Sequence, residues 1–171
     1  MRKLFGLFIM LSILLAAAGL AWAQEDIQQY SSCKYCGMDR LKFAFSRVYI
    51  EYDDGTTMGT CSIHCAAVDM ALNIDKAPQK ILVGDFNEKK LIDAEQASWV
   101  IGGVKTGVMT KRAKWAFGQR KAADMFTYEH GGRVATFEEA MKATYEDMYD
   151  DSKMIRDRRK MKRMKMMEEK K

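Results

Sequence analysis

The sequence predicts an α+β domain, because an early β-hairpin is followed by a mixture of extended and helical segments. The run from Phe43 to Tyr52 is aromatic and β-branched, and the turn signal Asp53-Asp54-Gly55 separates it from a second extended segment, so the two predict a hairpin. Residues 61–73 instead have a helical pattern. Cys61, Cys65, Val68 and Leu72 recur at intervals of four, three and four residues, which places them on one helical face. Strands and helices mixed in this order favour an α+β domain over a parallel α/β sheet.

Further short elements follow, separated by proline and glycine. They are a strand over 80–87, a short helix or the start of a strand over 92–100, a helix over 122–130, an extended piece over 133–135 and a helix over 137–150. The last helix has the clearest start signal, since Thr136 as N-cap and Glu139 three residues later form a capping box.

The first residues predict export from the cytoplasm. Arg2 and Lys3 precede an apolar run from Leu4 to Leu20, and small residues follow at the Ala21-Trp22-Ala23 site. We therefore expect a signal peptide over residues 1–23 that is cleaved after Ala23. A retained membrane anchor is the alternative, because an apolar run of 17 residues lies at the lower limit for crossing a bilayer.

The mature chain is expected to have three parts: a flexible leader over 24–32, a metal-binding domain over 33–151 and a basic, methionine-rich tail over 152–171. The charge is uneven, since Lys153 to Lys171 carry a net +7 while Gln24 to Ser152 carry −4. The tail has no aromatic residue and is expected to be helical or disordered. It could collect Cu(I) through its thioethers, but its cations favour contact with anionic lipid or an acidic partner. An exported protein is not expected to bind nucleic acid.

Two cysteine-bearing segments carry the chemistry, Cys33-Lys34-Tyr35-Cys36-Gly37-Met38 and Cys61-Ser62-Ile63-His64-Cys65. Thiolate and thioether are soft ligands that prefer Cu(I) to hard cations such as Mg²⁺. Gly37 allows a tight turn that brings the sulfurs of the first segment together. The four-residue interval puts Cys61 and Cys65 on one helical face, with His64 beside them as a possible ligand.

Three other interpretations of the four cysteines remain open. They could form two disulfides, because the exported chain meets an oxidising compartment. All four thiolates could hold a structural zinc ion that stabilises a binding domain. Cys33 and Cys36 could instead be a thiol-disulfide redox pair. No acid–base pair, activated nucleophile or phosphate loop is recognisable, so we expect a protein that is not an enzyme.

An ordered series of motifs resembles the NosL family, the accessory copper proteins of nitrous oxide reductase. The series consists of CKYCGM, the FAFSRVYIEYDDG hairpin, the second cysteine segment, IDAEQASWV and TGVMTKRAKWAFGQRKAADMFTYEHGG. It runs from about Cys33 to Ala140. The resemblance implies a small domain of ββαβ-type units that binds Cu(I) in the periplasm as a metallochaperone. It also implies delivery of copper to a reductase such as nitrous oxide reductase, through a membrane transporter complex.

The resemblance extends to individual residues. Cys36 and Met38 match the Cys-Gly-Met element of the family, Cys61 matches a cysteine after the hairpin, and Met109 matches a later methionine that could close the site, although a loop methionine also serves to fill a core. Two departures are the absence of a lipidated cysteine and Val108-Met109-Thr110 in place of Pro-Met-Gly. The complete set of candidate ligands for Cu(I), or alternatively Zn, is Cys33, Cys36, Met38, Cys61, His64, Cys65 and Met109.

Overall fold

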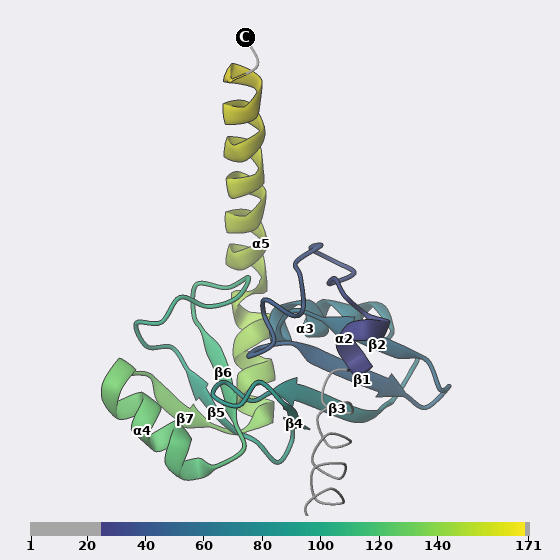
Figure 1. The fold of residues 1–171 in the computed structure, drawn as a ribbon, viewed down its shortest axis with the longest axis vertical. Coiled ribbons are helices and arrows are strands. Elements are labelled where there is room, and N and C mark those ends of the chain that lie inside the picture. The colour runs from purple at the N-terminus through teal and green to yellow at the C-terminus, as the bar shows by residue number, and fades with distance from the viewer. Residues whose placement is uncertain (1–24, 170–171) are drawn as a thin grey trace, which may run out of the picture.

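The computed structural model describes residues 25–169, which form two units of the same topology followed by a long helix (Figure 1). In the first unit, β1 (Val48–Tyr52) and β2 (Thr57–Thr60) form a hairpin, α3 (Ile63–Leu72) follows, and β3 (Pro78–Gly84) pairs with β1. The second unit repeats this order with β5 (Ser98–Ile101), β6 (Lys114–Phe117), α4 (Arg120–His130) and β7 (Arg133–Ala135). Both units are of ββαβ type, and the predicted α+β class is confirmed.

Each unit contributes one antiparallel sheet. The first sheet has the strand order β2-β1-β3-β4, with β4 (Leu91–Asp93) at one edge, and the second has the order β6-β5-β7. The opening strand of each unit is therefore an inner strand. The two sheets are connected where the backbone N–H of Phe86 donates to the carbonyl of Ala116 at 2.8 Å.

Two apolar clusters form the interior. The first includes Ile50 and Val83 of one sheet, Trp99 of the other, and Phe137 of the C-terminal helix α5 (Phe137–Glu168). The second contains aromatic side chains of β6 and α4 together with three of the four cysteines. The second cysteine-bearing segment is thus part of the packed interior rather than of a surface loop.

The helix α5 begins at the predicted capping box, where Glu139 N donates to Thr136 Oγ1 at 3.3 Å and Thr136 N donates to Glu139 Oε2 at 2.9 Å. It continues past the predicted end at residue 150 because no glycine or proline follows to interrupt it. The tail is therefore helical, one of the two states expected. The last buried residue of α5 is Asp151, and the second half projects from the domain (Figure 1).

Several predicted boundaries shift in the structure. The hairpin begins at Val48 rather than Phe43, because residues 41–46 form turns. The segment 92–100 contains the ends of two strands, β4 and β5, and the side chain of Asp93 caps the turn between them by accepting from the backbone N–H of Glu95 at 2.9 Å. The strand β6 was not predicted, since all its residues are buried, Lys114 included, and no alternating pattern marks it.

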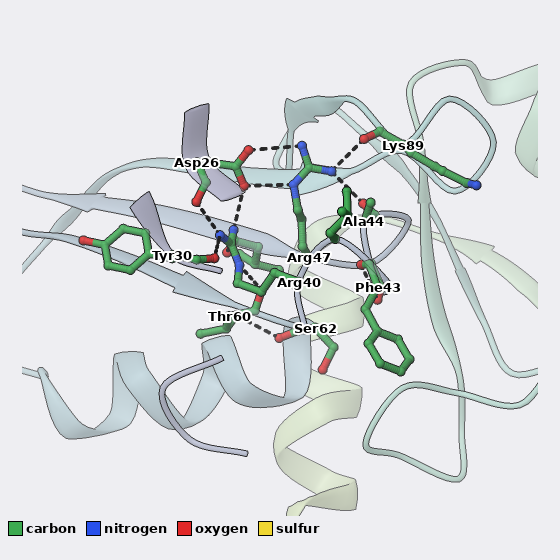
Figure 2. A network of polar contacts seen from close by, with 12 residues as sticks. Asp26, Tyr30, Arg40, Phe43, Ala44, Arg47, Thr60, Ser62 and Lys89 are labelled. Atoms are coloured by element: carbon green, nitrogen blue, oxygen red, sulfur yellow. Dashed lines mark hydrogen bonds and ion pairs between the residues drawn. The ribbon is translucent and has the colours of Figure 1, made fainter. Parts of the chain in front are cut away.

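The N-terminal segment differs from the flexible leader predicted over residues 24–32. Residues Glu25–Gln29 form the short helix α2, whose Asp26 carboxylate is buried between Arg40 and Arg47 (Figure 2). Arg40 Nη2 lies 2.7 Å and Arg47 Nε 2.8 Å from Asp26 Oδ2. Both guanidinium groups are fully buried and also donate to backbone carbonyls, including that of Thr60. Buried charges require such pairing, which fixes the leader to the domain.

The predicted signal peptide lies outside the described residues. Within residues 25–169, no helix is both long and apolar enough to cross a membrane. The long helix α5 fails on composition, since its second half carries many lysine and arginine side chains.

Candidate metal centre

The structure brings the four cysteine sulfurs together at one point. Their Sγ atoms all lie within 4.8 Å of one another. The Cys36 and Cys61 sulfurs are 3.4 Å apart, those of Cys61 and Cys65 are 3.8 Å apart, and all four thiols are free. A tetrahedral site with metal–sulfur bonds of about 2.3 Å has sulfur–sulfur separations of about 3.8 Å. The cluster can therefore enclose one soft metal ion with little movement.

A tight loop presents the first cysteine pair. The backbone N–H of Cys33 donates to the Met38 carbonyl at 2.9 Å, and the N–H of Gly37 donates to the Cys33 carbonyl at 2.8 Å. Gly37 has a φ of 73°, a left-handed conformation that glycine adopts without a steric cost. The turn that the sequence predicts at Gly37 is thus present, and it directs Cys33 and Cys36 to the same side.

The second cysteine pair lies at the start of α3. Cys61 follows β2 directly and Cys65 is in the first turn of the helix, so the predicted four-residue spacing places both sulfurs on one face. The Ser46 hydroxyl donates to the Cys61 carbonyl at 2.9 Å and fixes the chain before the helix.

The four thiols are hydrogen-bonded to one another, and these bonds shift their pKa values. The Cys33 sulfur accepts hydrogen bonds, first from Cys36 and then from Cys61 and Cys65, and these bonds lower the pKa of the Cys33 thiol. The hydrogen bonds to Cys33, together with burial, raise the pKa of the Cys61 and Cys65 thiols. Four neighbouring thiolates repel one another unless a cation neutralises them. Binding of a soft cation would therefore displace protons from the cluster.

The cluster is accessible at one corner. Cys61 is 0% exposed and Cys33 and Cys65 are 2% exposed, whereas Cys36 is half-buried. Arg159 of the projecting part of α5 approaches the same corner, with Nη2 3.5 Å from the Cys36 carbonyl oxygen. An incoming ligand would therefore reach the cluster first at Cys36.

Both candidate methionines pack against the apolar cluster that contains the cysteines. Met38 and Met109 are partly buried there. Met109 has a φ of 62°, which is rare for a residue with a side chain. The next residues hold its loop on α5, since Lys111 N donates to Asp151 Oδ1 at 3.0 Å and Arg112 Nε donates to Asp147 Oδ2 at 2.8 Å. The loop that carries Met109 is thus anchored on α5.

The remaining candidate, His64, lies apart from the group of metal-competent side chains found within residues 25–169. Its Nδ1 atom is 3.6 Å from Asp151 Oδ2, and both side chains are buried. Burial lowers the pKa of the imidazole, which is therefore neutral near pH 7. His64 is thus outside the four-cysteine group, and its Nδ1 atom faces Asp151 of α5.

Two residues next to the cluster were missed in the sequence. Tyr35 lies inside the first cysteine pair, and its hydroxyl donates to the buried carboxylate of Asp69 on α3. The spacing could have identified Asp69, because it follows Cys61 and Cys65 at the same interval of four residues and would share their helical face. A tyrosine between two cysteines gives no indication of its partner, so the contact itself could not be predicted.

Comparison with known proteins agrees with this architecture. The model of the NosL protein family matches residues 24–145. The crystal structure of the copper chaperone NosL from Shewanella denitrificans has a similar fold, with a TM-score of 0.51 at 22% identity over 64% of this chain and 89% of that one. No curated protein matches the chain. The structural similarity concerns the fold, and the family model covers most of the domain.

Proposed function

Since the chain belongs to the NosL family, we propose that it is a periplasmic metallochaperone that carries Cu(I) in its cysteine cluster. The observation that carries the proposal is the convergence of four sulfurs within 4.8 Å. Thiolates at this separation match a soft monovalent or divalent ion and offer nothing to a hard one. The expectation of a protein that is not an enzyme agrees with the family, since the solved NosL structure is that of a copper chaperone.

The accessible corner of the cluster supports transfer rather than permanent storage of the metal. A structural site is enclosed by its four ligands, whereas a metal that must be handed on needs a ligand that an acceptor can replace. Cys36 is the half-buried cysteine, and we propose that exchange with the recipient begins there. Met38 and Met109 pack against the apolar cluster that contains the cysteines, and we propose that they serve as thioether ligands during exchange.

A structural zinc site is the second candidate. The specific observation in its favour is the sulfur–sulfur distance of 3.8 Å between Cys61 and Cys65, which equals that expected in a tetrahedral zinc–sulfur site. The arrangement would then stabilise the first cysteine loop against α3. The two candidates differ in which metal the protein retains when both are supplied.

Titration of the anaerobically reduced protein distinguishes them. We expect one Cu(I) per chain in competition with a bicinchoninate chelator, and displacement of bound Zn(II) by Cu(I), because soft thiolates favour Cu(I). Metal content and chelator absorbance give the measurement. Retention of Zn(II) in the presence of excess Cu(I) would instead favour the structural zinc site.

For the recipient, we propose a copper-accepting reductase such as nitrous oxide reductase, or the transporter that assists its assembly. The resemblance of the motifs to the accessory copper proteins supports this choice. Export through the signal peptide over residues 1–23 would place donor and recipient in the same compartment. Reconstitution of the apo-reductase with copper-loaded protein, compared with free Cu(I) at the same chelator-buffered activity, measures delivery.

We also propose that the projecting half of α5 contacts an anionic membrane surface. From Arg156 onward its lysine and arginine side chains are exposed, while Met161 and Met164 form part of an exposed methionine stripe. A basic helix of this kind is attracted to anionic headgroups by about 1 kcal/mol per cation near the surface. The attraction places the metal centre near the bilayer, where a transporter would be reached.

Vesicle binding tests this contact. We expect cosedimentation with phosphatidylglycerol vesicles and its loss with phosphatidylcholine alone. The charge reversals Lys160→Glu, Lys162→Glu and Lys165→Glu together should weaken binding about a hundredfold, because each removes about 1 kcal/mol or more. The control changes the same net charge elsewhere, at the exposed Lys42, Lys121 and Lys142. Equal loss in both variants would show that net charge alone, and not α5, determines binding.

A further inference from the structure

A fully buried carboxylate, that of Asp69, lies on α3 one helical turn beyond Cys65. Asp69 is 0% exposed, and its two oxygens accept hydrogen bonds from two phenols, Tyr35 at Oδ1 and Tyr52 at Oδ2, the latter at 2.5 Å. The phenols are the donors in both bonds, because an ionised carboxylate can only accept. Of the ion pairs within residues 25–169, none includes Asp69, and the two tyrosines are its polar side-chain partners there.

Asp69 is attached to one cysteine pair and its partner Tyr35 to the other. Cys61 precedes α3, Cys65 and Asp69 lie on it, and the three follow one another at intervals of four residues, so the carboxylate lies one turn beyond Cys65. Tyr35 lies between Cys33 and Cys36 in the loop. The hydrogen bond between Tyr35 and Asp69 therefore joins the two segments that supply the four sulfurs.

Apart from the contacts among the cysteine thiols, the loop over residues 33–38 has few other polar connections to the rest of the domain. Its backbone hydrogen bonds run within residues 31–40, for example from Gly37 to Cys33 and from Arg40 to Ser31. The bond from Arg159 to the Cys36 carbonyl is longer, at 3.5 Å, and comes from an exposed side chain. A charge-assisted bond to a buried carboxylate is stronger than either kind. Apart from the thiol contacts, it is thus the main polar contact between the loop and α3.

We propose that Asp69 is a positioning residue of the metal centre, which acts through Tyr35 to hold Cys33 and Cys36 against Cys61 and Cys65. This inference rests on the proposed metal-binding function. Release of the metal requires the loop to separate from α3, because Cys36 at the accessible corner is on the loop. The Tyr35–Asp69 hydrogen bond opposes that separation and so sets the rate at which the metal leaves.

The chain provides a matched control. Tyr52 donates to the same carboxylate, but it lies at the end of β1 and not on the cysteine loop. The variants Tyr35→Phe and Tyr52→Phe each remove one phenol hydroxyl from Asp69 and leave an aromatic ring in place. A role in stability alone predicts the same consequence for both, whereas positioning of the loop predicts a consequence for Tyr35→Phe alone.

Two rates test the proposal, one with metal and one without. In the first, protein loaded with Cu(I) is mixed with excess bathocuproine disulfonate and metal release is followed by absorbance. In the second, reduced apoprotein is labelled with a disulfide reagent under native conditions and thiol reaction is followed. We expect Tyr35→Phe to raise both rates about tenfold, the lower end of the range for residues that orient metal ligands, and Tyr52→Phe to change them less than twofold.

The outcomes separate this proposal from the function on which it rests. Equal acceleration in both variants, or no acceleration in Tyr35→Phe, overturns the positioning role. If the wild-type protein binds neither Cu(I) nor Zn(II), the proposed function fails, yet faster thiol labelling in Tyr35→Phe alone still supports the contact as the device that holds the loop. Thermal denaturation of both apoproteins confirms that the two variants are folded to the same extent.

Discussion

Replacing Cys36 with serine is expected to lower the affinity for Cu(I) by about a hundredfold or more. Thiolate metal sites are held by about 10–16 kcal/mol in total, so the loss of one ligand in four costs on the order of 3 kcal/mol. The Cys36 sulfur lies 3.4 Å from that of Cys61. A serine hydroxyl is a hard ligand, and its C–O bond is shorter than the C–S bond of cysteine, so the oxygen binds a soft ion poorly and reaches less far toward it. The measurement is competition for Cu(I) against a chelator of known affinity under anaerobic conditions.

The position of Cys36 makes this variant informative. The side chain is half-buried, unlike the other three cysteines, so the substitution should leave the fold intact. The control is Lys34→Ser, an exposed change in the same loop that removes no sulfur and should leave the affinity unchanged. Unchanged affinity in Cys36→Ser would show that the accessible corner is not part of the metal centre.

Replacing Asp26 with alanine is expected to destabilise the domain by about 3–5 kcal/mol. Its carboxylate lies between the fully buried guanidinium groups of Arg40 and Arg47, and no bulk water is available to solvate them after its removal (Figure 2). Two like charges would then face each other in the interior. The shift of the urea midpoint, measured on reduced apoprotein, gives the change in the free energy of unfolding.

A neighbouring residue supplies the control for this prediction. Glu25→Ala removes the same charge from the same helix, but the side chain is exposed, so a change within about 0.5 kcal/mol is expected. A small effect of Asp26→Ala, comparable with that of Glu25→Ala, would contradict the assignment of the buried pair as a stabilising anchor.

The elements that the sequence predicted are those whose signals are local. The hairpin follows from the turn at Asp53-Asp54-Gly55, and the start of α5 from the capping box at Thr136, because both depend on residues a few positions apart. The helix α2 was missed because its burial depends on Arg40 and Arg47, which lie 14 and 21 residues further along the chain. The polar composition of residues 24–32 predicts a solvated leader, whereas in the structure the charge of Asp26 is neutralised by tertiary contacts.

The strand β6 was missed for a related reason. Lys114 interrupts the apolar pattern, yet its side chain is 0% exposed because Nζ donates to Asp147 of α5 at 2.6 Å. Burial lowers the pKa of this lysine, while the ion pair opposes that decrease. The local sequence pattern shows the charge of Lys114, but it does not show that Asp147, 33 residues further along the chain, pairs with it.

The candidate centre was predictable in part. Spacing placed Cys61 and Cys65 on one face, and the composition of both segments predicted that their sulfurs would meet, as they do. The orientation of His64 toward Asp151 was not predictable, since it follows from the packing of α3 on α5. The Tyr35–Asp69 contact joins residues 34 positions apart and has no local signal.

The helix α5 is packed in the core up to Asp151 and is exposed from Arg156 onward. A tilt of the packed part therefore moves the exposed part as one rigid rod. At a rise of about 1.5 Å per residue, its tip lies roughly 25 Å beyond Asp151, so a tilt of about 10° at the root displaces the tip by about 4 Å. The packed part includes Asp147 and Asp151, which accept hydrogen bonds from the loop that carries Met109. A tilt of the helix would therefore also move the loop that carries Met109, whose side chain packs against the apolar cluster containing the cysteines.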